Sequence, residues 1–425
     1  MLDAVVIGAG LAGLNCALTL ERAGLNVALL EAQDGPGGRV RTDVVDGFRL
    51  DRGFQILLTA YPEAQRALDY ERLKLCPMTP GALVWHEGAM HRLADPFRHP
   101  LLALGSLLDG TVPLGDKLKV ASLREKVKQG EIEEIFAAPE TTTLEFLRQY
   151  GFSEAMIERF FRPFFSGVFS EPGLKSSSRY FQFLFRMFAE GPAAVPELGM
   201  GEIPAQLAAA LKPETLSLST RVVRLEKLPQ GYRLKIEDGR EIEARTVVAA
   251  AGAHTLPLVG LSGLAAPGNG VTWNQTVTVY FTAERAPVEE PTLVLNGVGQ
   301  EDGPINHLTV MSCVSKAYAP PGAELIAANV VGQAPLRDLD LERLEAAVRG
   351  HARRIFGAPV DRWRRLRTYA IPHALPLAAH VMWNPQPVQR TSEGVYLCGD
   401  VTETPSIQGA LVSGRRVAEA LLASD

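Results

Sequence analysis

Residues 3–42 read DAVVIGAGLAGLNCALTLERAGLNVALLEAQDGPGGRVRT, in which short apolar runs alternate with glycines. Residues 4–7 are apolar and largely β-branched, as a buried parallel strand requires. The next apolar residues recur at helical spacing, which predicts a helix from about residue 11 to residue 22 that ends near Gly24. Residues 27–30 predict a second strand. The segment therefore predicts a strand, a glycine turn, a helix and a second strand within about 30 residues.

The glycines of the turn indicate a dinucleotide-binding site. Gly8 permits a tight turn, Gly10 lets the backbone approach a pyrophosphate, and Gly13 lets the helix pack close to the strand. The first helical residues, Leu11 and Ala12, supply free N–H groups at the positive end of the helix dipole. These features together predict phosphate binding at the start of the helix.

Glu31 ends the second predicted strand, 18 residues after Gly13. A carboxylate at this position accepts hydrogen bonds from both ribose hydroxyls and repels a 2′-phosphate. We therefore expect Glu31 and its neighbour Ala32 to contact the adenosine half of a dinucleotide, and NADP is disfavoured as the ligand.

The composition excludes several classes of protein. The chain has 425 residues, of which 46% are apolar and 21% charged, as in a soluble globular protein of two or three domains. The net charge of -5 argues against nucleic-acid binding. No zinc site, other metal site or disulfide scaffold is expected, because the four cysteines are far apart: Cys16, Cys76, Cys313 and Cys398. Neither a signal peptide nor a membrane span is evident, which predicts a cytoplasmic protein.

Two later segments add to the predicted nucleotide-binding sheet. Around residues 216–253, short alternating strands with a turn at Asp238 and Gly239 predict a β-meander, which leads into a buried strand. Residues 385–421 read PQPVQRTSEGVYLCGDVTETPSIQGALVSGRRVAEAL. This stretch predicts a strand over residues 395–398, a turn, and a helix that opens at residues 408–410.

Residues 3–55, 195–255 and 385–421 together resemble, in order and spacing, the superfamily of flavin amine oxidases, protoporphyrinogen oxidases and phytoene desaturase-type enzymes. The last segment is most similar to carotenoid desaturases, through its Gln-Arg-Thr, Gly-Asp and Gly-Ala-Leu-Val-Ser-Gly runs. The resemblance implies an FAD-dependent oxidoreductase. None of the cysteines stands in the pattern used for covalent flavin attachment, so the FAD is expected to be noncovalent.

The resemblance also implies the residues that contact FAD. Gly37, Gly38 and Arg39 would follow the diphosphate, and Asp400 would accept from ribityl hydroxyls. The helix at residues 408–410 would direct N–H groups at the flavin pyrimidine. The remaining implied contacts are Gly53, Phe54 and Gln55 near the flavin ring, Val222 and Val223 at adenine, and Gly252, Gly399, Gln408, Gly409 and Ala410.

The predicted fold class is α/β (α+β overall). A Rossmann-like FAD-binding domain with a β-meander is expected from residues 1–80, 195–265 and 385–425. It is interleaved with a mixed sheet-and-helix substrate domain, residues 81–194 and 266–384. Ten of the chain's 17 phenylalanines lie between Phe152 and Phe188 in this second domain. They predict either a helical core or an aromatic-lined tunnel for a large apolar substrate, and both can hold at once.

The sequence departs from the amine oxidase branch at one important position. That branch carries a lysine that holds a water against flavin N5, and Thr276 takes its place here, while the aromatic pair that cages an amine has no clear match. Candidate catalytic residues are His373 and Tyr369, and Tyr369 and Trp383 are candidates for aromatic contacts to the flavin face.

We therefore expect a desaturase or dehydrogenase that removes hydride from a large apolar, isoprenoid- or carotenoid-like substrate to flavin N5. One alternative is an oxidase of the protoporphyrinogen or amine type, and another is a redox-silent flavin isomerase. A peripheral membrane contact is an open expectation for residues 91–108, for which a packed helix after a loop is the favoured interpretation. The sequence does not specify the electron acceptor.

Overall fold

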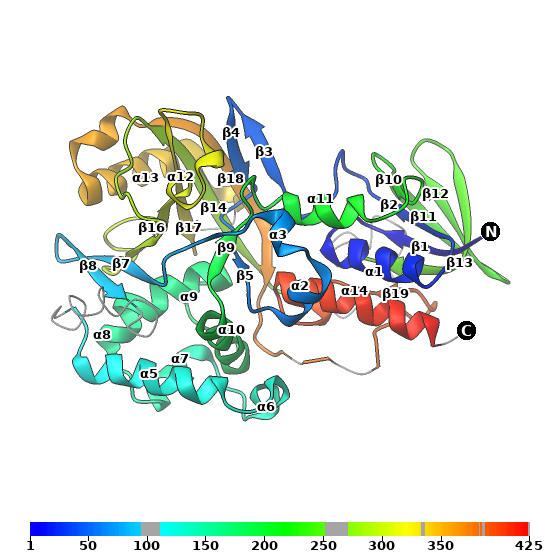
Figure 1. The fold of residues 1–425 in the computed structure, drawn as a ribbon, viewed down its shortest axis with the longest axis horizontal. Coiled ribbons are helices and arrows are strands. Elements are labelled where there is room, and N and C mark those ends of the chain that lie inside the picture. Colours follow the sequence, from blue (N-terminus) through cyan, green and yellow to red (C-terminus); the bar gives the residue numbers. More distant parts are fainter. Residues whose placement is uncertain (95–110, 251–270, 333–335, 382, 385–386, 424–425) are drawn as a thin grey trace.

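The computed structural model describes residues 1–94, 111–250, 271–332, 336–381, 383–384 and 387–423. Within these ranges, two seven-stranded sheets lie towards opposite ends of the molecule, and helices fill the space beside and between them (Figure 1). The predicted α/β class is confirmed by this mixture of parallel and antiparallel sheets with packed helices. No helix in the described ranges has both the length and the apolar character needed to cross a bilayer.

The first sheet contains the predicted strand–turn–helix–strand unit. Its parallel strands are β10 (Leu216–Ser217), β2 (Val27–Leu30), β1 (Leu2–Ile7), β13 (Glu241–Ala249) and β19 (Tyr396–Leu397). The predicted meander adds β12 (Gly231–Ile236) and β11 (Val222–Leu228), both antiparallel. The first residues of β13 pair with β12 and its last residues with β19, so one strand joins the meander to the C-terminal strand.

Three helices from distant parts of the chain pack near this sheet: α1 (Leu11–Arg22), α11 (Glu202–Ala209) and α14 (Ile407–Leu422). The first and last of them, α1 and α14, lie side by side (Figure 1). A Cβ on Gly414 of α14 would stand 2.1 Å from the Ala12 carbonyl oxygen, so only a glycine allows this close approach.

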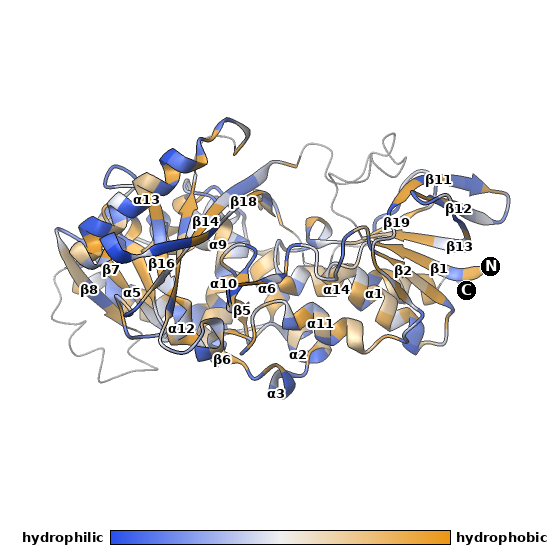
Figure 2. Cartoon of the chain, turned by 90° about the horizontal axis from the view of Figure 1, so that it is seen from above, coloured by the Kyte–Doolittle hydropathy of each residue, from blue (hydrophilic) through white to orange (hydrophobic). Residues whose placement is uncertain are grey.

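The second sheet is mainly antiparallel. Its order is β18 (Arg364–Pro376), β14 (Trp273–Ala283), β17 (Glu324–Val331), β16 (Ile305–Val310), β15 (Leu293–Asn296), β7 (Gly81–His86) and β8 (Ala89–Ala94). Helix α13 (Leu341–Phe356) covers the outer face, and in Figure 2 it carries both polar and apolar residues, as a helix with one face on a sheet requires. The inner face turns towards the helical layer and the first sheet.

The helical layer is built around the phenylalanine-rich segment. It comprises α5 (Leu114–Lys128), α6 (Ile132–Ala137), α7 (Thr143–Gln149), α8 (Glu154–Met156), a π-helix (Ile157–Phe161), α9 (Arg162–Phe169) and α10 (Ser178–Glu190). Five phenylalanines are almost completely buried, and their rings pack on one another, with Phe165 and Phe181 4.7 Å apart between ring centroids. The five are Phe161, Phe165, Phe169, Phe181 and Phe183. These side chains form a core, which is the first of the two interpretations of the segment.

Smaller elements connect the two sheets. They are the hairpin β3 (Thr42–Val45) and β4 (Phe48–Asp51), the three-stranded sheet β5 (Leu57–Leu58), β9 (Ala193–Val195) and β6 (Cys76–Pro77), and the helices α2 (Pro62–Ala67), α3 (Tyr70–Leu73) and α12 (Met311–Val314). Short 3₁₀ turns cover Lys316–Tyr318, Leu336–Asp338, Ala358–Arg362 and Asp400–Thr402.

The predicted elements agree closely with the structure where local signals are strong. Helix α1 and strand β2 have the predicted bounds, and Gly24 has the positive φ of a helix-ending glycine. The predicted strand over residues 395–398 is wrong at its ends, because only Tyr396 and Leu397 pair with β13. Residues 91–94 belong to β8 and not to a packed helix, and residues 95–108 lie outside the described residues, so the membrane contact stays a prediction. The domain boundaries stay a prediction.

Candidate functional site

The glycine turn after β1 has the geometry of a phosphate-binding turn. Gly8 has a φ of +100°, and a Cβ on Gly13 would stand 1.9 Å from the Gly8 carbonyl oxygen, so α1 begins directly against the turn. A Cβ on Gly10 would meet nothing within 4 Å, which means that open space lies against the backbone there. No side chain caps the N-terminus of α1. Its first N–H groups, including those of Leu11 and Ala12, are therefore available to an anion.

Glu31 is buried at the end of β2 and is held from two sides. One carboxylate oxygen accepts from the Ala9 backbone N–H at 2.7 Å, and the other accepts from the Gln33 N–H at 2.8 Å. The carboxylate thus lies beside the glycine turn, where the sequence predicts a ribose. Ala32 is the residue between Glu31 and its partner Gln33.

The Gly37-Gly38-Arg39 segment folds onto the same turn. Gly37 donates its N–H to the Ala9 carbonyl oxygen at 2.7 Å and forms a parallel bridge with Gly10. Gly37 and Gly38 both have positive φ values, +118° and +59°, which favour glycine. This packing brings the second predicted motif against the first.

Arg39 joins three of the predicted FAD segments. Its guanidinium pairs with the Asp400 carboxylate at 2.6 Å and donates to the Ala374 carbonyl oxygen at 2.9 Å. Its own carbonyl oxygen accepts from the Gln55 side-chain amide at 2.8 Å. Residues that are hundreds of positions apart in the sequence therefore meet at one guanidinium, which overlies the Trp273 ring at 5.6 Å.

The Gly53-Phe54-Gln55 segment connects this site to the second sheet. Gly53 has a φ of +92°, and a Cβ there would lie 3.5 Å from Ile371 on β18. The Phe54 backbone N–H donates to the Thr278 hydroxyl on β14 at 3.1 Å. The predicted flavin segment thus runs between the two sheets.

The start of α14 completes the site from the C-terminal end. Ser406 caps the helix by accepting from the Gly409 N–H at 3.0 Å, and a Cβ on Gly409 would stand 1.9 Å from the Thr404 carbonyl oxygen. Gln408 is buried, and its side-chain oxygen accepts from the Glu63 N–H at 2.8 Å. Ala410 follows in the first turn of the helix, and Gly399 has a φ of +145° and donates its N–H to the Ser413 hydroxyl.

The other predicted site residues differ from one another in burial and in their neighbours. Val222 is buried on β11 whereas Val223 is 39% exposed, so the two valines face opposite sides of the strand. Gly252 lies outside the described residues. The His373 ring packs edge-on against Trp273, at 5.3 Å between ring centroids, close to the Arg39 guanidinium.

The two remaining aromatic candidates are engaged elsewhere. The Tyr369 hydroxyl donates to the Asp43 carboxylate at 2.7 Å, and burial raises the pKa of Tyr369. Trp383 stacks on Phe136 of α6 at 5.2 Å and donates its ring N–H to Glu133, so it belongs to the helical layer.

Asp51 ends β4 in a completely buried position. Its carboxylate accepts from the Tyr318 hydroxyl at 2.7 Å, the Met200 N–H at 2.9 Å and the Thr42 hydroxyl at 2.5 Å. Burial raises the pKa of Asp51 to about 6. Asp51 therefore anchors β4 to β3, to Met200 just before α11 and to the 3₁₀ turn Lys316–Tyr318.

Sequence reasoning missed a polar row on the inner face of the second sheet. Thr278, Asn329 and His307 stand side by side on β14, β17 and β16, and all three are buried. The Asn329 side-chain oxygen accepts from the hydroxyls of Thr276 and Thr278, each at 2.9 Å. Thr276, which the resemblance places at the lysine position of the amine oxidase branch, is thus part of a neutral hydrogen-bond network. Strand register, which the sequence does not show, brings these residues together.

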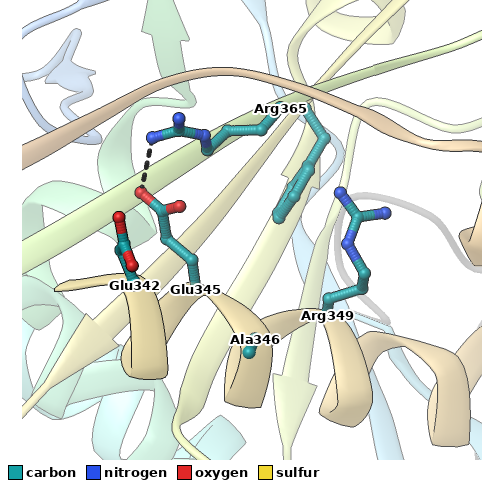
Figure 3. Close-up of a pocket in the computed structure, with 6 residues that line it drawn as sticks. Glu342, Glu345, Ala346, Arg349 and Arg365 are labelled. Atoms are coloured by element: carbon teal, nitrogen blue, oxygen red, sulfur yellow. Dashed lines mark hydrogen bonds and ion pairs between the residues drawn. The ribbon is translucent and has the colours of Figure 1, made fainter. Parts of the chain in front are cut away.

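A surface pocket on the outer face is separate from this site. It has a volume of about 280 Å³ and is lined by Phe281, Glu342, Glu345, Ala346, Arg349 and Arg365 (Figure 3). Glu345 pairs with Arg365 at 2.8 Å, and the Arg349 guanidinium covers the Phe281 ring. Phe281 and Thr278 point to opposite faces of β14, because they are three residues apart in a strand. The pocket therefore does not contribute to the glycine-rich site.

The residues of the glycine-rich site fit an FAD. Open space at Gly10, the uncapped start of α1 and the buried Glu31 carboxylate match the needs of the diphosphate and the ribose. A Cβ on Gly399 would meet only a valine methyl at 3.8 Å, so the backbone beside Asp400 is also accessible to a ligand. Arg39, Gln55 and the start of α14 would surround the flavin end.

Comparisons with known proteins agree with this geometry. The family described as flavin containing amine oxidoreductase matches residues 11–422. Putrescine oxidase from Kocuria rosea is 36% identical over 122 residues, which cover 26% of this chain and 25% of that protein. Hydroxyneurosporene desaturase from Rubrivivax gelatinosus is 38% identical over 92 residues, 20% of this chain and 17% of that protein. The alignments thus span a quarter or less of these relatives' lengths.

Solved structures show the same fold along the whole chain. An oxidoreductase from Methanosarcina mazei superposes with a TM-score of 0.76 at 18% identity, covering 98% of this chain and 100% of that one. A putative protoporphyrinogen oxidase from Exiguobacterium sp. 255-15 gives a TM-score of 0.72 at 20% identity, covering 100% and 99%. Since the family matches nearly the entire sequence, the predicted superfamily is confirmed: the chain belongs to the flavin containing amine oxidoreductase family and is an FAD-dependent oxidoreductase.

Proposed function

We propose that the protein is a desaturase or dehydrogenase that oxidises a large, uncharged, isoprenoid-like substrate. The observation that carries this proposal is the neutral character of the inner sheet face opposite Phe54. Thr276, Thr278 and Asn329 hydrogen-bond to one another there, and His307 beside them is kept neutral because burial lowers its pKa to about 3. A face of this kind offers no charge to hold an ammonium group and suits an uncharged substrate.

The surrounding residues are suited to positioning and to exclusion of water. The Phe54 segment is tied to Thr278, and the Phe54 ring packs edge-on against His307 at 4.8 Å between ring centroids. Behind His307, α9 contributes to the phenylalanine core. The phenylalanine core extends to the start of α14, where the hydroxyl of Tyr180 on α10 donates to the Pro405 carbonyl oxygen at 2.6 Å. Apolar packing on this side keeps water from the reacting C–H bond.

FAD, when bound, supplies the hydride acceptor at flavin N5. The chain's own part would be to hold it, with Arg39 and Asp400 at the ribityl and diphosphate side, Gln55 beside them, and the start of α14 at the pyrimidine. The N–H groups at that helix start would favour negative charge there. His373 packs against Trp273, which the Arg39 guanidinium overlies, and it remains a candidate residue for this part of the site.

An amine oxidase activity is the second candidate. It is favoured by the partial similarity to putrescine oxidase and opposed by the replacement of the lysine position by Thr276. The two candidates differ in the charge of the substrate that they accept.

Anaerobic reduction of the bound flavin separates the candidates. Purified FAD-loaded protein is mixed with phytoene in detergent micelles or with putrescine, and the bleaching of the oxidised flavin absorbance is followed. We expect bleaching with phytoene and none with putrescine. The opposite result makes the protein an amine oxidase. If the flavin stays oxidised with both substrates but is reduced by dithionite, the proposed substrate class is excluded. This result would favour the redox-silent alternative.

A further inference from the structure

Two buried hydrogen-bond donors lie next to each other on the inner face of the second sheet. His307 of β16 is the register partner of Asn329 of β17, and Asn329 is in turn the partner of Thr278 of β14. Directly paired residues of antiparallel strands point to the same face, with Cβ atoms about 5 Å apart. His307 and Asn329 are each only 3% exposed. The sheet therefore places an imidazole and an amide side by side beneath the Phe54 segment.

A β-bulge turns His307 to this face. The register shifts between Ile305 and His307, so that Asn306 is an extra residue in β16. Ile305 consequently packs in the outer core, whereas His307 points inwards. Bulges of this kind commonly re-aim a side chain beside a functional site.

The His307 ring is fixed in position by its neighbours. The Asn306 side-chain amide donates to the Pro163 carbonyl oxygen at 2.8 Å and lies 3.0 Å from His307 Nδ1. A Cβ on Gly167 of α9 would stand 2.8 Å from the ring, so glycine is needed for this packing. Pro163 belongs to α9, which follows directly on a π-helix, a distortion that is frequent at functional sites.

These contacts determine which ring nitrogen carries the proton. Asn306 reaches Pro163 with its amide N–H, and the same amide nitrogen therefore donates to His307 Nδ1. The proton of the neutral ring is then on Nε2. Nε2 is buried and has no hydrogen-bond partner in the described part of the chain. His307 thus presents an unpaired N–H donor.

The amide of Asn329 is oriented in the same way. The Thr278 hydroxyl accepts from the Phe54 N–H and gives its own proton to Asn329 Oδ1, and the Thr276 hydroxyl shares its proton between this oxygen and the Val330 carbonyl oxygen. The Oδ1 atom is therefore occupied and Nδ2 is turned away from the threonines. Among the residues that the structure describes, Nδ2 makes no hydrogen bond to a protein atom.

We propose that His307 and Asn329 form a donor pair that binds an uncharged oxygen, a hydroxyl or a carbonyl, on the substrate. This rests on the proposed function, because it adds one polar group to an otherwise apolar substrate. Leaving a buried donor such as His307 Nε2 unpaired costs about 1–3 kcal/mol, and an acceptor oxygen from a ligand removes that cost. A protonated amine, which also donates hydrogen bonds, cannot serve as this acceptor.

The test compares two isoprenoid ligands of the same carbon skeleton, of which only one carries an oxygen. FAD-loaded protein is titrated with farnesol and with farnesene, a hydrocarbon of the same skeleton, and the change in flavin fluorescence gives each Kd. We expect farnesol to bind roughly tenfold more tightly than farnesene, as one or two neutral hydrogen bonds imply. His307→Phe and Asn329→Leu are expected to lose this preference while the Kd for farnesene stays within about twofold.

Thr309→Val is the matched control. It removes a buried hydroxyl from the same strand, two residues beyond His307, and leaves the donor pair intact. We expect it to keep the wild-type preference, and FAD content confirms folding of every variant. Equal affinities in the wild type, or a preference that survives in both donor variants, overturns the donor pair without affecting flavin reduction by phytoene.

A thermal measurement keeps the donor pair testable if neither isoprenoid binds, a result that counts against the proposed substrate class. The unpaired Nε2 donor contributes nothing to the ligand-free fold, whereas Nδ1 accepts from Asn306. His307→Asn removes the Nε2 donor without adding bulk against Gly167, and it is expected to lose no more stability than the single Asn306 contact, about 0.5–1.5 kcal/mol. A larger loss, measured by thermal unfolding against Thr309→Val, makes His307 a structural residue and overturns the inference.

Discussion

Asp51 is the buried acid with the clearest effect on how stability varies with pH. It accepts hydrogen bonds from Tyr318, Met200 and Thr42, yet burial still raises its pKa from 3.8 to about 6. The donors lower the cost of the charge, and the loss of solvation outweighs them. The folded protein therefore binds a proton more readily at this site than the unfolded chain does.

This linkage predicts a pH dependence that Asp51→Asn removes. Between about pH 4 and about pH 6 the folded state holds more protons than the unfolded state, so the Asp51 contribution to stability falls as pH rises. The shift of roughly two pKa units corresponds to about 3 kcal/mol. We expect the free energy of unfolding of the wild type, relative to Asp51→Asn, to decrease by about this amount from pH 4 to pH 7. Urea unfolding at several pH values measures it, and a constant difference contradicts the prediction.

Single residues also show the limit of sequence reasoning about the site. Gly8, Gly10, Gly13 and Glu31 are recognisable because their spacing follows one strand and one helix. His307 and Asn329 lie 22 residues apart on strands whose register is shifted by a bulge, and no local pattern marks either of them. Local geometry is encoded locally, whereas cross-strand neighbours depend on the whole sheet.

At the scale of elements, the start of α14 combines a cap with a predicted flavin contact. Ser406 caps α14 through the Gly409 N–H, and Thr142 caps α7 through the Glu145 N–H in a full capping box. Both caps hold the first turn of a helix, but only the first lies in a segment implied to contact FAD. Variants of these two caps, compared with each other, therefore separate an effect on helix stability from an effect on FAD binding.

Ser406→Ala and Thr142→Ala are expected to cost similar stability, about 0.5–2 kcal/mol each, because each removes an N-cap acceptor. Only Ser406→Ala is expected to weaken FAD binding, since it loosens the N–H groups of the first turn of α14. Denaturant unfolding gives the stability, and titration of the apoprotein with FAD gives the affinity. Equal FAD affinity in the two variants would show that the cap plays no part in the cofactor site.

The same scale explains which elements were predictable. The bounds of α1 and β2 follow from apolar periodicity and a terminal glycine, signals contained in the segment itself. Strand β19 is shorter than expected because its length depends on pairing with the end of β13. The phenylalanine-rich helices were predicted as helices, but whether their rings face a core or a tunnel depends on neighbouring helices.

At the scale of the whole molecule, the two ends of the chain form one structure. Helices α1 and α14 lie side by side, and both carry segments of the cofactor site at their N-termini (Figure 1). Their close approach depends on Gly414, whose absent Cβ would stand 2.1 Å from the Ala12 carbonyl oxygen and 3.1 Å from the Cys16 backbone nitrogen. All the nearest atoms are backbone, so a side chain here is accommodated only if the helices separate.

Gly414→Ala is therefore expected to destabilise the protein by about 1–3 kcal/mol or more, as overpacking does, although alanine favours helices. Gly350→Ala on α13 is the matched control, because a Cβ there meets nothing within 4 Å and is expected to stabilise by about 0.5–1 kcal/mol. Displacement of α1 also moves the glycine turn, so FAD affinity should fall at least roughly tenfold in Gly414→Ala alone. FAD titration of both apoproteins tests this.

Because FAD binds only the folded state, the same high concentration of FAD should raise the unfolding temperature less in Gly414→Ala than in Gly350→Ala. Similar FAD-induced shifts in the two variants would mean that the contact between the chain ends does not position the cofactor site.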